Sequence, residues 1–307
     1  MRQSIRGYAD GVIEQEAGSG RLPLTASELG SVGDLIAGSA DLRRVLLDPG
    51  VPLLARRNVV RDLFSPRVDA PTLRLLVFAV DADRAPGLVD NIAWLAARMD
   101  AAARELVPTG HAVLGRRAAE ERVDGYATAV LESLESQASL ARVQDELFRF
   151  HQIVGGSEEL GTALSSRDLD GDVRAKIVVD LLEGRSDPTT VRLAAYATHI
   201  GRSRDYHNLL AHLVDRVAAE RNRRLADVRS AVELDDSQQA DLASALGRVV
   251  GHEVEVRVTV DPYVLAGFVA TVGDTVVDGS ARHRLELLKD RLVMPEVTMS
   301  TGEPSDG

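Results

Sequence analysis

Gly7-Tyr8-Ala9-Asp10-Gly11-Val12 returns 118 residues further along the chain as Gly125-Tyr126-Ala127-Thr128-Ala129-Val130. These stretches begin a gap-free alignment with 27 identities in the 95 positions from residue 7 to residue 101. Self-similarity at one fixed spacing is the signature of a repeated structural unit. The chain therefore contains two copies of one domain. Other identical pairs include Glu28 and Glu146, Leu42 and Leu160, Arg56 and Arg174, and Arg74 and Arg192.

The period of the repeat fixes the predicted domain organisation. It exceeds the roughly 20 to 50 residues of a solenoid unit, so each copy should be a globular domain with its own core. The sequence after about residue 225 has no counterpart in either copy. We predict a first helical copy at 1–107, a linker at 108–116, a second copy at 117–224, a third domain at 225–295 and a disordered tail at 296–307.

Composition narrows the class of protein. With 45% hydrophobic and 27% charged residues the chain is typical of a globular protein, and the 4% of aromatics favours helical cores of Leu, Val, Ala and Ile. A net charge of -11 argues against nucleic acid as a partner. No apolar run is long enough for membrane insertion, the first six residues lack a signal-peptide core, and cysteine is absent. We expect a cytosolic protein without disulfides.

The spacing of apolar residues in both copies predicts helices. Leu29, Val32 and Ile36 recur at intervals of three and four, which places them on one helical face. Turn sequences such as Asp48-Pro49-Gly50 separate the helical runs. Five or six helices per copy result.

The third domain has a different period. Valines alternate with polar residues from Val254 to Val260, which is typical of a strand with one buried face. Before it, a helix capped in Asp235-Asp236-Ser237 carries Leu242, Leu246 and Val249 on one side. We predict a strand at 264–272, a hairpin turn at Gly273-Asp274, a return strand at 275–277, and a last helix from Ser280 with Leu285, Leu288 and Leu292. The predicted fold is mainly α, with two tandem six-helix bundles and a small α+β domain.

Several motifs that suggest chemistry have a better structural interpretation. The acidic run Asp168 to Asp172 resembles a calcium loop, but valines occupy the positions that need glycine and glutamate, so a helix N-cap at Asp170 or Asp172 is favoured. His252-Glu253 lacks the second histidine of a zinc protease. His207 and His212 are five residues apart and should face different sides of a helix. The chain has no phosphate-binding glycine motif and no nucleophile elbow. We predict no catalytic residue, metal or cofactor.

The segment 260–280 carries a family resemblance. It is similar to the signature of the delta subunit of F-type ATP synthase, which is the oligomycin-sensitivity-conferring protein of mitochondria, and the following residues 282–292 continue the match. The second copy resembles the helical N-terminal domain of this family, so the match spans about 117–293. The first copy resembles an extra helical domain of certain actinobacterial members. The signature positions are Leu265, Ala266, Gly267, Gly273, Asp274, Asp278, Gly279 and Ser280, where the family usually has glycine in place of Ala266.

The resemblance implies a non-catalytic stator subunit that joins the catalytic head to the membrane-anchored stalk. It implies a groove between the first and fifth helices that accepts the N-terminal helices of an alpha subunit. It also implies that the third domain meets the b subunit, with 293–299 as a candidate contact. The implied alpha-binding residues are Tyr126, Ala129, Val130, Leu193, Tyr196, Ala197 and Ile200, and a second groove, for alpha or the stalk, would contain Tyr8, Val12, Leu75, Phe78 and Ala79.

The same residues allow less specific interpretations. Apolar side chains at helical spacing can simply fill the core of their own bundle, and about half of the groove residues are expected to do so. A helical adaptor unrelated to ATP synthase would share the duplication but not the signature. An enzyme with its site between domains would need converging polar groups with perturbed pKa values. The location implied by the resemblance is the cytoplasmic face of the plasma membrane, as a peripheral part of the synthase.

Overall fold

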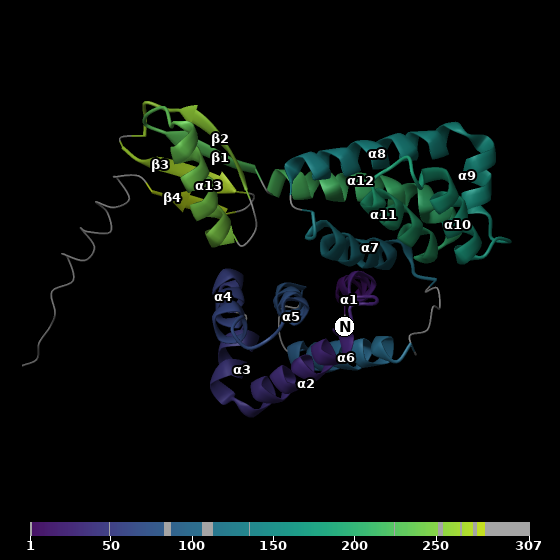
Figure 1. Ribbon diagram of the computed structural model, residues 1–307, viewed down its shortest axis with the longest axis horizontal. Helices are drawn as coiled ribbons and strands as arrows, with labels where there is room; N and C mark the ends of the chain where they lie inside the picture. Colours follow the sequence, from purple (N-terminus) through teal and green to yellow (C-terminus); the bar gives the residue numbers. More distant parts are fainter. Residues whose placement is uncertain are drawn as a thin grey trace, which may run out of the picture. The chain divides into compact units, whose positions relative to one another are not determined.

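The computed structural model contains two compact units, residues 1–220 and 221–307 (Figure 1). The predicted boundary and linker between the two helical copies stay a prediction, since both copies fall in the first unit. The residues described are 2–48, 50–82, 87–105, 113–134, 136–223, 225–250, 254–264, 266–272 and 275–279.

Each copy forms six α-helices within the described residues, at equivalent positions of the repeat. The prediction of two six-helix bundles is therefore confirmed. The first copy contains α1 (Gln3–Gln15), α2 (Leu22–Gly38), α3 (Ala40–Leu47), α4 (Leu53–Phe64), α5 (Ala70–Ala82) and α6 (Leu88–Ala103). The second contains α7 (Arg116–Leu131), α8 (Gln137–Gly156), α9 (Glu158–Ser165), α10 (Gly171–Leu182), α11 (Pro188–His199) and α12 (Tyr206–Arg223).

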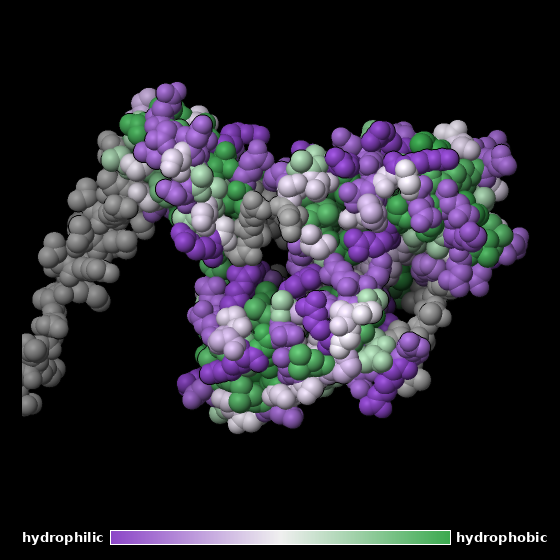
Figure 2. All heavy atoms as spheres, in the orientation of Figure 1, coloured by the Kyte–Doolittle hydropathy of each residue, from purple (hydrophilic) through white to green (hydrophobic). Residues whose placement is uncertain are grey.

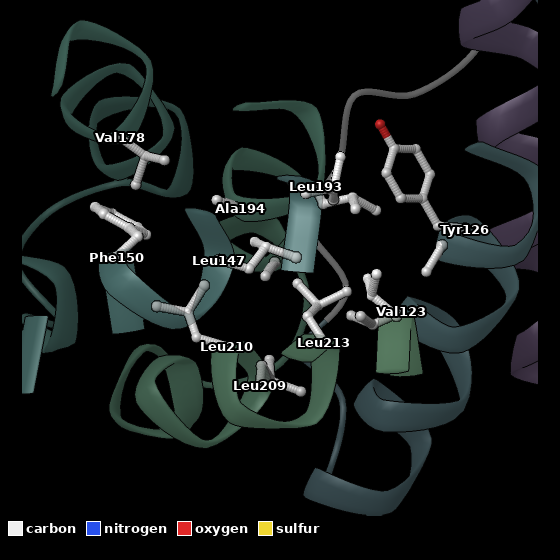
Figure 3. Packing of buried hydrophobic residues seen from close by; sticks show 14 of the residues in the cluster. Val123, Tyr126, Leu147, Phe150, Val178, Leu193, Ala194, Leu209, Leu210 and Leu213 are labelled. Carbon is white, nitrogen blue, oxygen red and sulfur yellow. The ribbon is translucent and has the colours of Figure 1, made fainter. Parts of the chain in front are cut away.

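The cores of the two copies consist of the residues that the helical spacing selects. Leu29, Val32 and Ile36 of α2 are buried in the first copy. In the second copy, Leu147 and Phe150 of α8 pack among leucines of the other helices, as Figure 3 shows. Asp170 caps α10 by accepting a hydrogen bond from the amide of Asp172, as expected for this acidic run.

A half-buried glutamate ties the second helix of each copy to the start of the fifth. Glu146 of α8 accepts hydrogen bonds from the Asp187 amide at 2.8 Å and from the Thr190 hydroxyl at 2.7 Å. Glu28 of α2 does the same with Asp69 and Thr72. This shared contact explains why the glutamate is identical in both copies.

Replacing Glu146 by alanine is expected to lower the free energy of unfolding by about 1 to 3 kcal/mol, because the fully buried Thr190 hydroxyl loses its acceptor. Chemical denaturation measures this difference. Asp145→Ala is the matched control on an exposed face of the same helix. Equal losses for the two variants would contradict the role of the Glu146 carboxylate.

The second unit is a four-stranded sheet with a helix. It contains β1 (Leu225–Ser230), α13 (Asp236–Val250), β2 (Glu255–Val260), β3 (Phe268–Val272) and β4 (Thr275–Asp278), with strand order β2-β1-β3-β4. β1 and β2 are parallel, so their connection must cross over, and α13 supplies it. β3 is antiparallel to β1 and β4.

The core of this unit lies between α13 and one sheet face. Leu242, Leu246 and Val250 of the helix pack against alternate residues of β1 and β3. Two expectations from the sequence are wrong. Val249 is 44% exposed while Val250 is buried, and the strand predicted from residue 264 begins at Phe268, because Val264 closes a turn with the carbonyl of Asp261. The predicted last helix, with Leu285, Leu288 and Leu292, and the tail lie outside the described residues.

The surface of the helices is mixed. On the face shown in Figure 2, hydrophilic residues cover much of the helical unit, with smaller hydrophobic areas between them. Exposed apolar side chains include Phe148 and Ile153 of α8. No helix among the described residues combines the length and hydropathy needed to cross a bilayer.

Candidate helix-docking interface

The first helices of the two copies, α1 and α7, pack backbone against backbone (Figure 1). A Cβ atom added to Gly7 would lie 1.8 Å from the carbonyl oxygen of Arg122, and one added to Gly125 would lie 1.8 Å from the carbonyl oxygen of Ser4. These two contacts are equivalent under the 118-residue repeat, so the interface is reciprocal. Only glycine permits this approach.

A second pair of small residues continues the contact. A Cβ on Gly11 would lie 2.7 Å from the Cβ of Ala129, which occupies the equivalent position in the second copy. Ala129 also belongs to the hydrophobic cluster of the first copy rather than the second. The copies therefore share part of their core across α1 and α7.

Reciprocal tyrosine–glutamate hydrogen bonds flank the small residues. The hydroxyl of Tyr8 donates to Glu132 at 2.5 Å, and that of Tyr126 donates to Glu14. Each tyrosine is buried and stacks on a ring from the fifth helix of its own copy. The ring centroids of Tyr126 and Tyr196 are 3.7 Å apart, and those of Tyr8 and Phe78 are 4.0 Å apart. The first and fifth helices of each copy thus form one aromatic surface that faces the other copy.

One ionic cluster exists on only one side of the interface. Asp10 of α1 pairs with Arg122 of α7 at 2.7 Å, accepts from the hydroxyl of Tyr196 at 2.7 Å, and pairs with Arg98 at 3.2 Å. The side chains of Asp10 and Arg122 are only 15% and 12% exposed, so this pair is better shielded from solvent than a surface salt bridge. The repeat places uncharged Thr128, Ser4 and Phe78 at the equivalent positions of Asp10, Arg122 and Tyr196.

Arg74 of α5 links the first copy to α7 on the opposite side. Its guanidinium donates to the Ala129 carbonyl oxygen at 2.8 Å and to Glu132 at 3.1 Å, and it donates to Gln15 at 3.0 Å. The Gln15 amide itself donates to the same Ala129 carbonyl at 2.8 Å. These hydrogen bonds join polar groups of both copies at the rim of the interface.

Burial raises the pKa of the three tyrosines at this interface. For Tyr126 the buried ring and the Glu14 carboxylate both disfavour the tyrosinate. For Tyr8 the causes are burial and then Glu132, and for Tyr196 they are burial and then Asp10. These phenols are therefore held in the protonated form that donates a hydrogen bond to a carboxylate.

The residues of the predicted alpha groove divide into two groups. Tyr126, Ala129 and Tyr196 lie where α1 contacts the second copy. Val130, Leu193, Ala197 and Ile200 belong to the core of the second copy itself, beneath this surface. Figure 3 shows Tyr126 at the edge of that core, with its hydroxyl directed away from Val123 and Leu213.

The predicted second groove divides in the same way. Tyr8 and Phe78 form the aromatic pair beside α7, while Val12, Leu75 and Ala79 are buried in the core of the first copy. Asp10, Glu14 and Arg122 are interface residues that were not predicted from the sequence. Identity between Gly7 and Gly125 and between Glu14 and Glu132 was the available signal.

The signature residues that are described hold the sheet of the second unit. Gly267 has a φ of +85°, which lies in the left-handed region that favours glycine. The preceding Ala266 does not have a positive φ, so its backbone does not require glycine. A Cβ on Gly279 would lie 3.0 Å from the Phe268 ring, and Asp278 pairs with Val269 in the β3–β4 ladder. Leu265, Gly273, Asp274 and Ser280 lie outside the described residues.

The histidines of α12 contact different partners. His212 lies 2.7 Å from Asp124, which raises the pKa of its imidazole through that hydrogen bond, and His207 stacks on His151. No cluster of three or more metal-ligating side chains occurs in the described part of the chain.

The fold and the interface define a class of protein built to bind helices: two helical bundles, each with a first-and-fifth-helix surface that carries another helix, followed by a small α+β unit. The sequence profile of the ATP synthase delta (OSCP) subunit matches residues 123–292. The chain belongs to this family, and it is a structural subunit of the peripheral stalk of F-type ATP synthase.

Full-length relatives extend the match to the first copy. The ATP synthase subunits delta of Frankia alni and Kineococcus radiotolerans are each 33% identical over 268 residues, covering 87% of both chains. That of Nocardia farcinica is 32% identical and covers 87% of this chain and 89% of its own length. Such matches cannot fit within the region after residue 122, so they include most of the first copy. The match to a chain of the Toxoplasma gondii mitochondrial ATP synthase hexamer covers 57% of this chain and 98% of that one, at 17% identity and a TM-score of 0.28.

Proposed function

We propose that this subunit joins the catalytic alpha/beta head to the membrane-anchored b stalk and resists the torque of the rotor during proton-driven ATP synthesis. It does so without catalysis or a cofactor, at the cytoplasmic face of the plasma membrane. Its mechanical contribution comes from helix-on-helix contacts, in which small residues let backbones approach and buried side chains exclude water.

The observation that carries this proposal is the use of the first and fifth helices as a docking surface. α1 lies against Tyr126 and Tyr196 of the second copy. The end of α7 lies against Tyr8 and Arg74 of the first copy. A surface that accepts one helix is suited to another of matching shape and charge.

We assign the N-terminal helices of the alpha subunit to the surface of the second copy. Tyr126, Ala129 and Tyr196 would touch the incoming helix. The core residues beneath them would keep the docking surface rigid, and these are Val130, Leu193, Ala197 and Ile200. The equivalent surface of the first copy is a second candidate position for alpha or for the stalk. The α+β unit would take the end of the b subunit.

Purification of the tagged full-length chain from membranes tests this assignment. Alpha, beta and b subunits are expected to co-purify, and an alpha subunit that lacks its N-terminal amphipathic segment should lower the recovery of the head at least tenfold. A beta subunit with a trimmed N-terminus is the matched control. Recovery of the chain without any synthase subunit would refute the proposal.

A further inference from the structure

α1 has two faces with different partners. Ile5, Tyr8, Ala9 and Val12 are buried in the core of the first copy. Tyr8 and Gln15 also reach the second copy, through hydrogen bonds to Glu132 and to the Ala129 carbonyl. The close backbone approach and the groups that bind Arg122, Tyr126 and Tyr196 come from a separate stripe, spaced so that its members share one side of the helix. That stripe consists of Gln3, Gly7, Asp10, Gly11 and Glu14.

The stripe is small and acidic rather than apolar. Two glycines four residues apart allow close approach, and Glu14, three residues after the second, accepts from Tyr126. α7 presents the same order of residue types to the first copy, with Gly125, Ala129 and Glu132. The common pattern is small-x3-small-x2-Glu. In each copy, a tyrosine on the first helix donates a hydrogen bond to the glutamate of the pattern in the other copy.

We propose that α1 is a built-in competitor for the docking surface of the second copy. A partner helix reaches Tyr126, Tyr196 and Arg122 only by replacing α1, and it binds there by presenting two small residues four apart with carboxylates at the positions of Asp10 and Glu14. The proposal rests on the proposed function in one respect, because it takes the N-terminal helix of the alpha subunit as the partner.

The geometry makes the two bindings mutually exclusive. Arg122 and Tyr196 already share the Asp10 carboxylate, and the Gly7 backbone leaves no space for a second helix at Arg122. Because Ala129 is part of the first copy's core, removing α1 from this surface also parts the two copies. The apparent affinity for a partner helix is then its intrinsic affinity multiplied by the fraction of chains that are open.

A single substitution opens the surface without altering it. Gly7→Leu adds a side chain to α1 whose Cβ overlaps the Arg122 carbonyl, and all three nearest neighbours of that Cβ belong to the second copy. Residues of the docking surface stay unchanged. Gly30→Leu on α2, where a Cβ meets no atom within 4 Å, is the matched control.

A disulfide closes the same surface. The chain has no cysteine, so Gly11→Cys with Ala129→Cys provides one defined pair. The Cβ atoms would lie 2.7 Å apart, so the helices must separate by about 1 Å to reach disulfide geometry. The oxidised protein is compared with the same protein after reduction, and circular dichroism verifies that both are helical.

Two labelled peptides serve as probes of the full-length variants. One is a synthetic copy of residues 2–19 of this chain, and the other is the N-terminal segment of the alpha subunit of the same synthase. We expect both to bind Gly7→Leu at least tenfold more tightly than the unaltered chain or Gly30→Leu. Both should bind the oxidised double-cysteine protein at least tenfold more weakly than its reduced form.

Two results would overturn the proposed competition, and a third result bears on the proposed function. Equal affinity of the alpha peptide for opened and locked chains would place alpha at another surface, while the proposed head attachment would stand. Binding of the residue 2–19 peptide alone would show that α1 has no competitor. Loss of co-purification of the head with the unaltered chain would instead refute the proposed function itself, whichever peptide binds.

Discussion

The Gly125→Leu variant is expected to uncouple the two helical copies while leaving each bundle folded. The new Cβ would lie 1.8 Å from the backbone oxygen of Ser4, and no side-chain rotation can relieve an overlap with backbone. α1 and α7 must therefore separate, which removes the tyrosine–glutamate bonds and exposes the paired small residues. Overpacking of this kind costs about 1 to 3 kcal/mol, and the lost hydrogen bonds add to it.

Hydrogen exchange followed by mass spectrometry measures this separation. Amides of α1 and α7 should exchange on the order of 100-fold faster, which corresponds to about 3 kcal/mol of lost coupling, while α9 and α10 keep their protection. Gly115→Leu, placed just before α7 where a Cβ meets nothing within 4 Å, is the control. If Gly125→Leu kept the protection of the unaltered chain, the close approach of the two helices would be wrong.

Much of this fold can be predicted because the two copies in the chain can be aligned with each other. Identity between the copies selects residues that every such bundle needs, as the contacts of Glu146 and of buried Arg174 show. Arg174 donates to the carbonyl oxygens of Leu169 and Thr198, which ties the loop before α10 to the last turn of α11. These are structural roles, so repetition alone could not separate them from docking residues.

The pairing of the copies could not be predicted from helical periodicity. An apolar stripe indicates which face of a helix is buried, but small and acidic residues on the opposite face look like ordinary solvent exposure. Glycine inside a helix costs about 1 kcal/mol relative to alanine, so Gly7 and Gly11 in one helix were a signal of close packing. The ion pair at that packing could not be found from the repeat, because Asp10 and Arg122 have uncharged counterparts in the other copy.

The resemblance to a known family predicted a groove for the alpha subunit, and that groove stays a prediction. Tyr126 and Tyr196 were expected to line an apolar groove, and they do lie on the first and fifth helices. Their hydroxyl groups donate to carboxylates, so the surface binds acidic residues of a helix as well as matching the helix in shape. A groove inferred from single-copy relatives gives no indication that a second copy can cover it.

Alkaline titration is expected to report on the same interface. The chain has five tyrosines, and burial raises the pKa of Tyr8, Tyr126, Tyr196 and Tyr206. Each of these pKa values in the folded chain exceeds the value of about 10 in an unfolded chain. As the pH rises, the unfolded state therefore loses these protons at a lower pH than the folded state. The stability from these groups is therefore complete below about pH 10 and is lost as the pH rises above it.

Absorbance of tyrosinate and circular dichroism, recorded on one sample, test this sign. In the unaltered chain the four phenols should ionise together with the loss of helix, in one cooperative transition. In Gly125→Leu, three of them lose the cover of the other copy and should ionise while the helices persist. The Tyr206 hydroxyl donates to the carbonyl of Ala194 within the second copy, so Tyr206 should still ionise only when the protein unfolds. Ionisation of Tyr206 together with the other three before unfolding would show that the second copy, and not the interface, had been disrupted.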